Sequence, residues 1–306
     1  MYDLIIIGAG PAGLAAALYA TRKRLSFQLV SKDLGGKSNY TIHFPDADEN
    51  QVIQARELVT VYRSRVESLR HSTTLKPVKA LSGGDRSFEV TLGNDSVLQA
   101  RTVLLATGTT PQPIGVPGER ELLGKALGYS AISYSHLLSG KTAFLCGNSD
   151  RVLSSALELS LHTERVTVAL LPGSSVNPRL RSRVERLDDV ELLDDATVKQ
   201  FSGEKFATRA TVVSGGVERT IEADAFFVET DPIANTGFAE SLLDLGEKGA
   251  VAIDGGNATS VPGLFAAGDV TGAGFEQVLV ALGDGTKAIL GIYRYLLEND
   301  LLQERE

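Results

Sequence analysis

Short apolar runs alternate along the chain with glycine-rich turns and with segments of helical periodicity. Residues 4–7 form a continuous apolar run, which is typical of a parallel strand covered on both faces. The alanine-rich residues 14–24 predict a helix, and residues 27–30 predict the next strand. Apolar residues recur at helical spacing from 54 to 69, which predicts a second helix. The chain therefore begins with a strand, a turn, a helix and another strand.

The same strand–turn–helix–strand pattern starts again further along the chain. Residues 88–92 and 97–105 alternate or run apolar, as strands do. Proline and glycine then punctuate residues 107–118, which predicts a crossover between domains. Beyond it, we expect strands and helices at these positions: strands at 142–145, 166–170, 210–214 and 221–228, a helix at 152–161, and a final helix at 277–297.

This order of elements predicts an α/β protein with two Rossmann-like domains of the three-layer ββα type, the second inserted into the first. We expect residues 1–112 and 236–306 to form the discontinuous outer domain and residues 113–235 to form the inserted domain. A chain of 306 residues is long enough for two such cores.

A G-x-G-x-x-G motif, GAGPAG at 8–13, directly follows the first predicted strand and opens the first predicted helix. Gly8 permits the tight turn, Gly10 lets the backbone approach a pyrophosphate, and Gly13 lets helix and strand pack closely. The helix N-terminus offers N–H groups and the positive end of its dipole to phosphates. We therefore expect Gly8, Gly10, Pro11, Ala12 and Gly13 to bind a dinucleotide.

In a dinucleotide-binding fold, the end of the second strand lies close to the adenosine ribose of the ligand. An acidic residue usually stands there and binds the ribose, but this chain has Ser31, followed by Lys32. A serine hydroxyl can still form a hydrogen bond with a ribose hydroxyl. We therefore expect Ser31, Lys32 and the nearby Gly36 to contact the cofactor.

Two further segments resemble the two-domain flavin disulfide reductases, and over nearly its whole length the chain resembles the low-molecular-weight thioredoxin reductases. ATG at 106–108, followed by GVPG at 115–118, and PGLFAAGDV at 262–270 match FAD motifs of this group, in the family's order. The resemblance implies that the chain binds FAD, with Asp269 on the ribitol chain. It implies the following further contacts: Ala106, Thr107, Gly108, Gly268, Glu276, Gln277 and Val278.

The resemblance fails at the redox-active disulfide. The family passes electrons from NADPH to FAD and on to a C-x-x-C pair in the inserted domain. Alignment through Gly124 and Tyr129 puts Ser130 and Ser133 at the two cysteine positions, and Cys146 is the only cysteine. A hydroxyl cannot cycle between thiol and disulfide. Dithiol–disulfide exchange is therefore excluded, and we interpret Cys146 as an apolar strand-end residue, with a reactive thiol as the alternative.

The nucleotide motif of the inserted domain is altered as well. In CGNSDR at 146–151, we expect Cys146 and Asn148 at the two glycine positions and Arg151 at the position of a small residue. Asp150 would face a pyrophosphate with the wrong charge. We therefore do not expect NADPH as a cofactor, although a distorted nucleotide site remains the alternative.

Basic residues for the 2′-phosphate of NADPH are also missing at the end of the next strand. The family has basic residues there, whereas this chain has LLP at 170–172. Arg179, Arg181 and Arg183 follow later. We interpret these arginines as an exposed basic helix face, with a substitute phosphate site as the alternative.

Charge and the N-terminus limit the partners. A net charge of −8 argues against nucleic acid, which needs a basic surface. The apolar run from 4 to 20 is broken by three glycines and a proline, so it predicts neither a signal peptide nor a membrane span. We expect a cytoplasmic protein and, by fold analogy alone, a homodimer.

Together these features predict an FAD-dependent oxidoreductase that uses neither an internal dithiol nor NADPH. The electron donor stays open between a protein donor, a thiol and a second flavin bound in the vacated pocket. The alternatives are a cysteine-independent NAD(P)H flavin or ferredoxin reductase and a non-catalytic flavin-binding sensor. His43 and His136 are the candidate acid–base groups, each with a packing or surface role as the alternative, and we expect no metal site.

Overall fold

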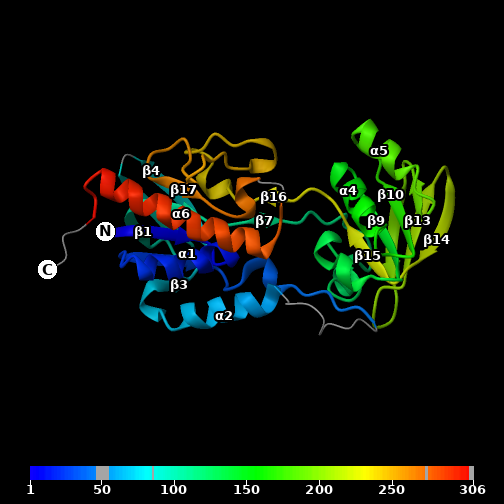
Figure 1. Cartoon of the computed structure of the whole chain (residues 1–306), viewed down its shortest axis with the longest axis horizontal. Helices are drawn as coiled ribbons and strands as arrows, with labels where there is room; N and C mark the ends of the chain where they lie inside the picture. Colours follow the sequence, from blue (N-terminus) through cyan, green and yellow to red (C-terminus); the bar gives the residue numbers. More distant parts are fainter. Residues whose placement is uncertain (46–54, 85, 273–274, 303–306) are drawn as a thin grey trace. The chain divides into compact units, whose positions relative to one another are not determined.

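The computed structural model describes residues 1–45, 55–84, 86–272 and 275–302, which form two compact units (Figure 1). Unit 1 contains the described residues of 1–39, 55–110 and 233–302, and unit 2 those of 40–45 and 111–232. The expected domain boundaries were 112 and 236, against 110 and 233 here. Unit 2 also takes in the segment 40–45, because Ile42 and Phe44 are buried in its core.

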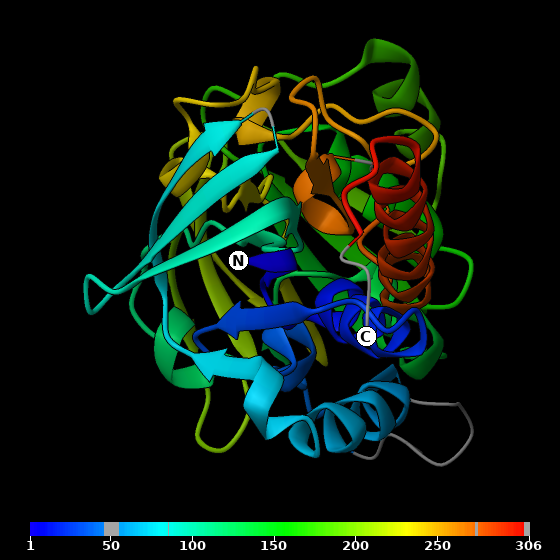
Figure 2. The ribbon, with the colours of Figure 1, turned by 90° about the vertical axis from the view of Figure 1, so that its left-hand side faces the viewer.

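Unit 1 is built on a mainly parallel seven-stranded sheet. Its strands lie in the order β3 (Thr73–Leu75), β2 (Phe27–Ser31), β1 (Tyr2–Ile7), β6 (Val97–Leu105), β5 (Ser87–Leu92) and β4 (Val78–Gly84), with β17 (Leu264–Ala266) also paired to β6. β1 pairs in parallel with both β2 and β6, so its apolar run is buried. In Figure 2 the antiparallel hairpin of β4 and β5 (cyan) is seen at the left and the C-terminal helix (red) at the right.

One face of this sheet is covered by helices, namely α1 (Pro11–Arg22), α2 (Ala55–Glu67) and α6 (Val278–Glu298). Successive strand residues point to opposite faces, so Leu4 and Ile6 pack with the helices while Ile5 and Ile7 belong to the core of the other face. α1 and α6 pack side by side (Figure 1). No described helix combines the length and the apolar composition that a membrane crossing requires.

Short elements complete unit 1. The strands β7 (Thr109–Thr110) and β16 (Ile233–Ala234) pair with each other in antiparallel fashion. The remaining elements in the described part of unit 1 are short 3-10 helices: η1 (Gly36–Asn39), η3 (Arg70–Ser72), η5 (Gly237–Ala239), η6 (Glu247–Gly249) and η7 (Asp269–Thr271).

Unit 2 has three layers. Its central parallel sheet has the order β11 (Val190–Leu193), β10 (Arg165–Leu170), β9 (Thr142–Gly147), β15 (Ala225–Val228) and β8 (Leu127–Gly128). One face packs against α4 (Asp150–Leu159), α5 (Pro178–Val184) and the 3-10 helix η4 (Ile132–Leu137). The other face packs against an antiparallel sheet of β12 (Thr197–Ser202), β13 (Arg209–Ser214) and β14 (Val217–Glu222), with α3 (Glu119–Leu122) nearby. This is the predicted ββα arrangement.

The single strand expected over 221–228 is wrong, because the structure divides it between two sheets. β14 ends at Glu222 and pairs with β13, whereas β15 begins at Ala225 and joins the parallel sheet. The chain turns at Asp224, whose carboxylate accepts hydrogen bonds of 2.8 Å from both the backbone N–H and the hydroxyl of Thr142. An apolar pattern alone does not reveal such a turn, since Ile221 before it and Ala225 after it are both buried.

Candidate functional site

The glycine motif of unit 1 lies in the turn between β1 and α1, as predicted. Gly8 has a φ of 104°, and a Cβ there would collide with the carbonyl oxygen of Ala106. A Cβ on Gly13 would collide with the carbonyl oxygen of Gly8. Both glycines therefore let β1, α1 and the end of β6 pack at distances that a side chain would prevent.

Gly10 differs from these two glycines because the space beside it is open. It is the N-cap of α1, and a Cβ built there meets no atom within 4 Å. No side chain caps this helix, and Pro11 at its first position has no N–H. The next amides of the first turn have no acceptor within the helix. This helix start therefore combines open space, free donors and a positive dipole end, which together fit a pyrophosphate.

Ser31 supports the turn from within. Its hydroxyl accepts a hydrogen bond of 3.1 Å from the N–H of Ala9, and the carbonyl of Ala9 accepts one of 2.7 Å from Gly35. The hydroxyl keeps its own proton as a donor for a ribose oxygen, so the ribose contact stays a prediction. Lys32 is exposed, and a Cβ on Gly36 would lie 3.2 Å from Cα of Gly10, which places this segment against the motif.

The ATG segment and the second FAD motif reach the same helix start. A Cβ on Gly268, which has a φ of 75°, would lie 3.1 Å from Cβ of Ala12. The hydroxyl of Thr107 is buried and has no hydrogen-bond partner among the described residues. The carbonyl of Thr107 accepts a bond of 2.9 Å from the Asn235 side chain. Thr107 thus carries an unsatisfied polar group that a ligand would satisfy.

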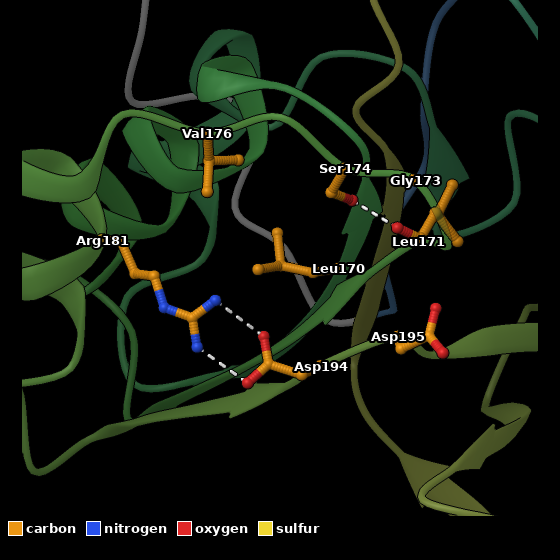
Figure 3. A pocket seen from close by; sticks show the side chains of 8 residues that line it. All are labelled: Leu170, Leu171, Gly173, Ser174, Val176, Arg181, Asp194 and Asp195. Atoms are coloured by element: carbon orange, nitrogen blue, oxygen red, sulfur yellow. Dashed lines mark hydrogen bonds and ion pairs between the residues drawn. The ribbon is translucent and has the colours of Figure 1, made fainter.

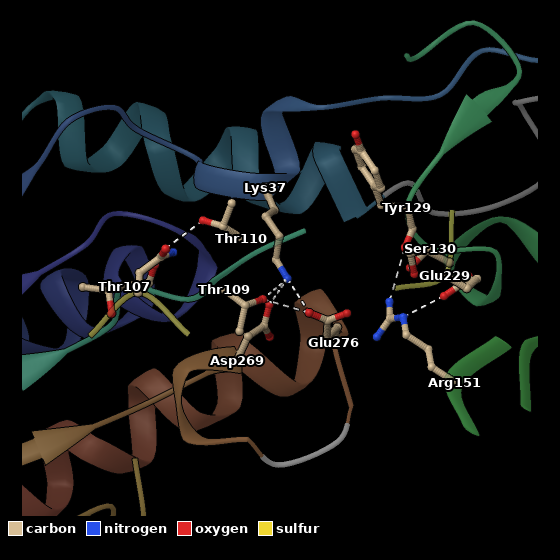
Figure 4. Close-up of polar contacts among 12 residues, drawn as sticks. Lys37, Thr107, Thr109, Thr110, Tyr129, Ser130, Arg151, Glu229, Asp269 and Glu276 are labelled. Carbon is tan, nitrogen blue, oxygen red and sulfur yellow. Dashed lines mark hydrogen bonds and ion pairs between the residues drawn. The ribbon is translucent and has the colours of Figure 1, made fainter. Parts of the chain in front are cut away.

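Lys37 connects the segments around this site (Figure 4). Its ammonium lies 2.6 Å from Oδ2 of Asp269, 2.7 Å from Oε1 of Glu276 and 2.8 Å from the hydroxyl of Thr109. The Thr109 hydroxyl donates in turn to Glu276 at 2.9 Å. Lys37 and Thr109 were not predicted from the sequence, although each directly follows a residue expected at the site, Gly36 and Gly108.

The residues of unit 1 fit FAD. The open helix start suits its pyrophosphate, and the unpartnered hydroxyl of Thr107 suits one of its polar groups. α6 begins at Val278 with Gln277 as its N-cap and without a side-chain cap, so its positive dipole end is offered to a ligand as well. The individual contacts expected from Ala106, Gly108 and Gln277 stay predictions.

The corresponding turn of unit 2 follows β9. Ser149 is the N-cap of α4, as Gly10 is of α1. Counting from the N-caps places Gly147 and Val152 at the positions of Gly8 and Gly13. A Cβ on Gly147 would collide with the carbonyl of Glu229, the first residue after β15, as one on Gly8 would with the residue after β6.

The expected register of this second motif was therefore wrong by one residue. Cys146 is the last but one residue of β9 and does not form the turn, and Asn148 and Arg151 do not occupy the second glycine and small-residue positions. The tight-turn glycine is present as Gly147. The conclusion that the motif is altered holds in the new register, because Ser149 and Val152 replace its second and third small residues.

Polar side chains occupy the start of α4. The hydroxyl of Ser149 donates to Asp231 at 2.8 Å and accepts from the N–H of Arg151 at 3.4 Å, which caps the helix. Asp150 accepts a bond of 2.6 Å from the N–H of Asn177. One amide of the helix start is thus taken by the protein itself. Two carboxylates add negative charge at this helix start.

Arg151 and Glu229 form a buried ion pair in unit 2 (Figure 4). Nε of Arg151 lies 2.6 Å from Oε2 of Glu229, whose side chain is 1% exposed. Oε1 of Glu229 accepts a hydrogen bond of 2.6 Å from Ala131, and Arg151 donates to the carbonyl of Tyr129 at 3.3 Å. Burial raises the pKa of Glu229, and the charge of Arg151 opposes that shift. The pair ties α4 to the segment that carries Ser130.

Ser133 lies at the start of η4 and Ser130 lies just before it, where the resemblance places the cysteine pair. Their hydroxyl oxygens are 2.9 Å apart and share a hydrogen bond. Cys146 is fully buried in β9, and burial raises the pKa of its thiol above the ordinary value. The interpretation of Cys146 as an apolar strand residue is confirmed. Tyr129, next to Ser130, has its pKa raised to about 12 by burial and by Glu119.

The two candidate histidines belong to unit 2 and have exposed side chains. The backbone of His43 accepts from Ala126 and donates to Gly124, each at 2.9 Å. His136 lies in η4, and partial desolvation lowers the pKa of its ring. Their expected roles as acid–base groups stay predictions.

A pocket of about 250 Å³ lies at the carboxyl ends of β10 and β11 (Figure 3). Arg181 contributes to its lining, but both of its Nη atoms bind Asp194, at 2.9 and 2.7 Å, and its Nε binds Glu185 at 2.7 Å. These carboxylates raise the pKa of Arg181. Arg179 and Arg183 are exposed. The alternative of a substitute phosphate site therefore gains no support from Arg181, because its charge is already compensated within unit 2.

Comparisons with known proteins agree with these features. The family model described as pyridine nucleotide-disulphide oxidoreductase matches residues 2–285. The chain is 30% identical over 302 residues to a "NADH dehydrogenase" of Bacillus subtilis (strain 168), covering 97% of the chain and 59% of that protein. It is 28% identical over 303 residues to an alkyl hydroperoxide reductase component of Staphylococcus aureus (strain MRSA252), covering 97% and 60%. The chain thus spans about 60% of the length of these relatives.

Solved structures show the same architecture. The thioredoxin reductase of Streptococcus pyogenes MGAS5005 superposes with a TM-score of 0.87 at 27% identity, covering 97% of this chain and 99% of that one. The enzyme from Giardia duodenalis gives 0.87 at 24% identity with the same coverage, which supports the fold alone. The chain has two Rossmann-like domains, the second inserted into the first, and its single cysteine excludes a redox-active pair within it. Because the family model matches nearly the whole chain, this chain belongs to the flavin-dependent pyridine nucleotide-disulphide oxidoreductase family.

Proposed function

We propose that the chain is an FAD-dependent oxidoreductase that transfers electrons without an internal dithiol and without NADPH bound to unit 2. The observation that carries the proposal is the contrast between the two helix starts. α1 begins at the open, uncapped Gly10, whereas α4 begins at Ser149, which caps its own helix and binds Asp231. A pyrophosphate is attracted to the first and repelled from the second.

Bound FAD supplies the redox chemistry, and the residues of unit 1 hold it. The amides at the start of α1 bind the pyrophosphate, and Thr107 donates its unpartnered hydroxyl. Asp269, whose carboxylate also binds Lys37, would accept hydrogen bonds from the ribitol hydroxyls. The start of α6 stabilises negative charge on the flavin by its dipole.

The electron donor in this proposal is a protein, a thiol compound or a second flavin in the place that the nucleotide has left. The acceptor is unassigned. The chain acts as a cytoplasmic homodimer. The loss of both thiols at positions 130 and 133 supports a donor or acceptor that reaches FAD without a protein disulfide.

Anaerobic titration of the FAD-loaded chain with NADPH and with NADH tests this proposal. The flavin absorbance is expected to stay unchanged with both nucleotides and to bleach with dithionite, which serves as the control for a reducible flavin. Prompt stoichiometric bleaching by NADPH would contradict the proposal.

One observation favours a second candidate, a cysteine-independent NADH-dependent reductase. The relative from Bacillus subtilis carries the name "NADH dehydrogenase", and Gly147 keeps the tight turn that a nucleotide fold requires. Bleaching by NADH but not by NADPH in the same titration would select this candidate. The charge of Arg181 at this pocket is already compensated by Asp194, which agrees with a preference against the 2′-phosphate.

A further inference from the structure

The segments that carry Lys37 and Asp269 lie on the start of α1. Gly36 packs against Gly10, and Gly268 packs against Ala12, with added Cβ atoms at 3.2 and 3.1 Å from these neighbours. Lys37 and Asp269 each directly follow one of these packed glycines. Their side chains meet at 2.6 Å (Figure 4). The ion pair therefore joins the two segments that flank the expected pyrophosphate site.

Lys37 contacts two carboxylates at once. Asp269 and Glu276 lie 2.6 and 2.7 Å from the single ammonium, and their side chains are only 14% and 19% exposed. The hydroxyl of Thr109 bonds both Lys37 and Glu276. Like charges that are close and poorly solvated repel each other strongly. Without Lys37, two carboxylates would share a site that also receives an anionic cofactor.

We propose that Lys37 is a positioning residue for FAD, which holds Asp269 and Glu276 in place and offsets their charge, and thereby determines both FAD affinity and the reduction potential of the bound flavin. This inference rests on the proposal that unit 1 binds FAD. Two-electron reduction with uptake of one proton adds one negative charge to the flavin. A nearby ammonium favours that product, whereas two carboxylates that have lost the Lys37 cation oppose it.

The test compares Lys37→Met with Lys37→Arg, which keeps the charge, and with the control Lys79→Met. Lys79 forms a pair of 2.6 Å with Asp95, but both side chains are well exposed, at 63% and 73%. Two quantities are measured: the Kd for FAD, from fluorescence of the apoprotein, and the midpoint potential, against a reference dye. Lys37→Met is expected to raise the Kd by about tenfold or more, the scale of one lost charge-assisted hydrogen bond, and to make the potential more negative. Lys37→Arg and Lys79→Met are expected to keep a Kd for FAD and a midpoint potential close to those of the parent.

A double variant separates charge from packing. Lys37→Met with Glu276→Gln removes one carboxylate together with the cation, so it is expected to recover most of the FAD affinity. It also serves as the test if Lys37→Met alone does not fold. Parent-like Kd and potential in Lys37→Met, or a double variant that binds no better than the single one, would overturn the inference. A parent chain that binds no FAD would instead overturn the proposed function, and this inference with it.

Discussion

The guanidinium of Arg151 lies 2.6 Å from the carboxylate of Glu229, a residue with 1% of its side-chain surface exposed. Arg151 is the second residue of α4, so the pair lies at the helix start that binds the pyrophosphate in a Rossmann fold. The same pair holds Ala131 and Tyr129, on both sides of Ser130. One interaction therefore joins the altered nucleotide turn and the segment where the resemblance places the cysteine pair.

Arg151→Ala tests how far the stability of unit 2 depends on this pair. Removing the guanidinium leaves the Glu229 charge buried without its partner, so we expect a loss of about 3–5 kcal/mol in the free energy of unfolding, measured in urea. Arg209→Ala is the matched control, because the pair of Arg209 and Glu222 lies at 3.0 Å with exposed side chains. It is expected to cost at most about 1 kcal/mol. Equal losses for the two variants would show that the buried pair has no special role.

Tyr129 predicts a loss of stability at alkaline pH. Its pKa is raised from 10.0 to about 12, first by burial and then by the charge and the hydrogen bond of Glu119. Between these two values the folded chain binds the phenolic proton while the unfolded chain releases it. Stability from this group is therefore fully present below pH 10.0 and is lost as pH rises to about 12.

Tyr129→Phe tests this titration. Unfolding experiments at several pH values are expected to show a smaller alkaline loss of stability in the variant than in the parent. At neutral pH the variant loses only the 3.3 Å hydrogen bond to Glu119, worth about 1 kcal/mol. If the free energy of unfolding fell equally steeply with pH in both proteins, the raised pKa of Tyr129 would be contradicted.

The elements that were predicted correctly from the sequence are those that depend on patterns of neighbouring residues. The apolar run of β1, the spacing in α2 and the glycine turn before α1 each lie within a few residues, and each is in the structure. The register of the second turn was missed because an apolar cysteine before Gly147 can end a strand or begin a turn. The N-cap of α4 decides between the two, and Ser149, a residue type that favours this position, marks it in the sequence.

The polar clusters could not be predicted in the same way. Lys37 and Glu276 are 239 positions apart in the sequence, and Arg151 and Glu229 are 78 apart. No periodicity links such residues, and only the folded sheet order brings them together. Asp269 and Glu276 were expected at the site because family motifs include them, whereas no motif marks Lys37 or Glu229.

Cys146 is expected to be chemically silent in the folded chain. It is fully buried in β9, and burial raises the pKa of its thiol, so little thiolate is present and reagents have no access. An alkylating reagent at mildly alkaline pH should leave the native chain unmodified, as read by mass. The urea-unfolded chain should take up one equivalent, which is the internal control. Rapid modification of the native chain would restore the reactive-thiol alternative.

Gly10 and Gly13 distinguish ligand binding from packing within one motif. Gly10 has a φ of −69° and open space beside it, so Gly10→Ala is expected to change the stability of the apoprotein by less than about 1 kcal/mol. Its methyl group would instead occupy the space into which the pyrophosphate fits, and FAD affinity should fall by at least about tenfold, the scale of one lost charge-assisted hydrogen bond. The Kd is measured by fluorescence titration of the apoprotein.

Gly13→Ala is the matched comparison, because its Cβ would collide with the carbonyl oxygen of Gly8. Overpacking of this kind typically costs about 1–3 kcal/mol, so the apoprotein itself should unfold at lower urea concentration. The two alanine variants thus separate the two properties: Gly10→Ala loses FAD affinity at preserved stability, and Gly13→Ala loses stability first. If Gly10→Ala kept the parent's FAD affinity, the pyrophosphate would have to bind elsewhere than at the start of α1.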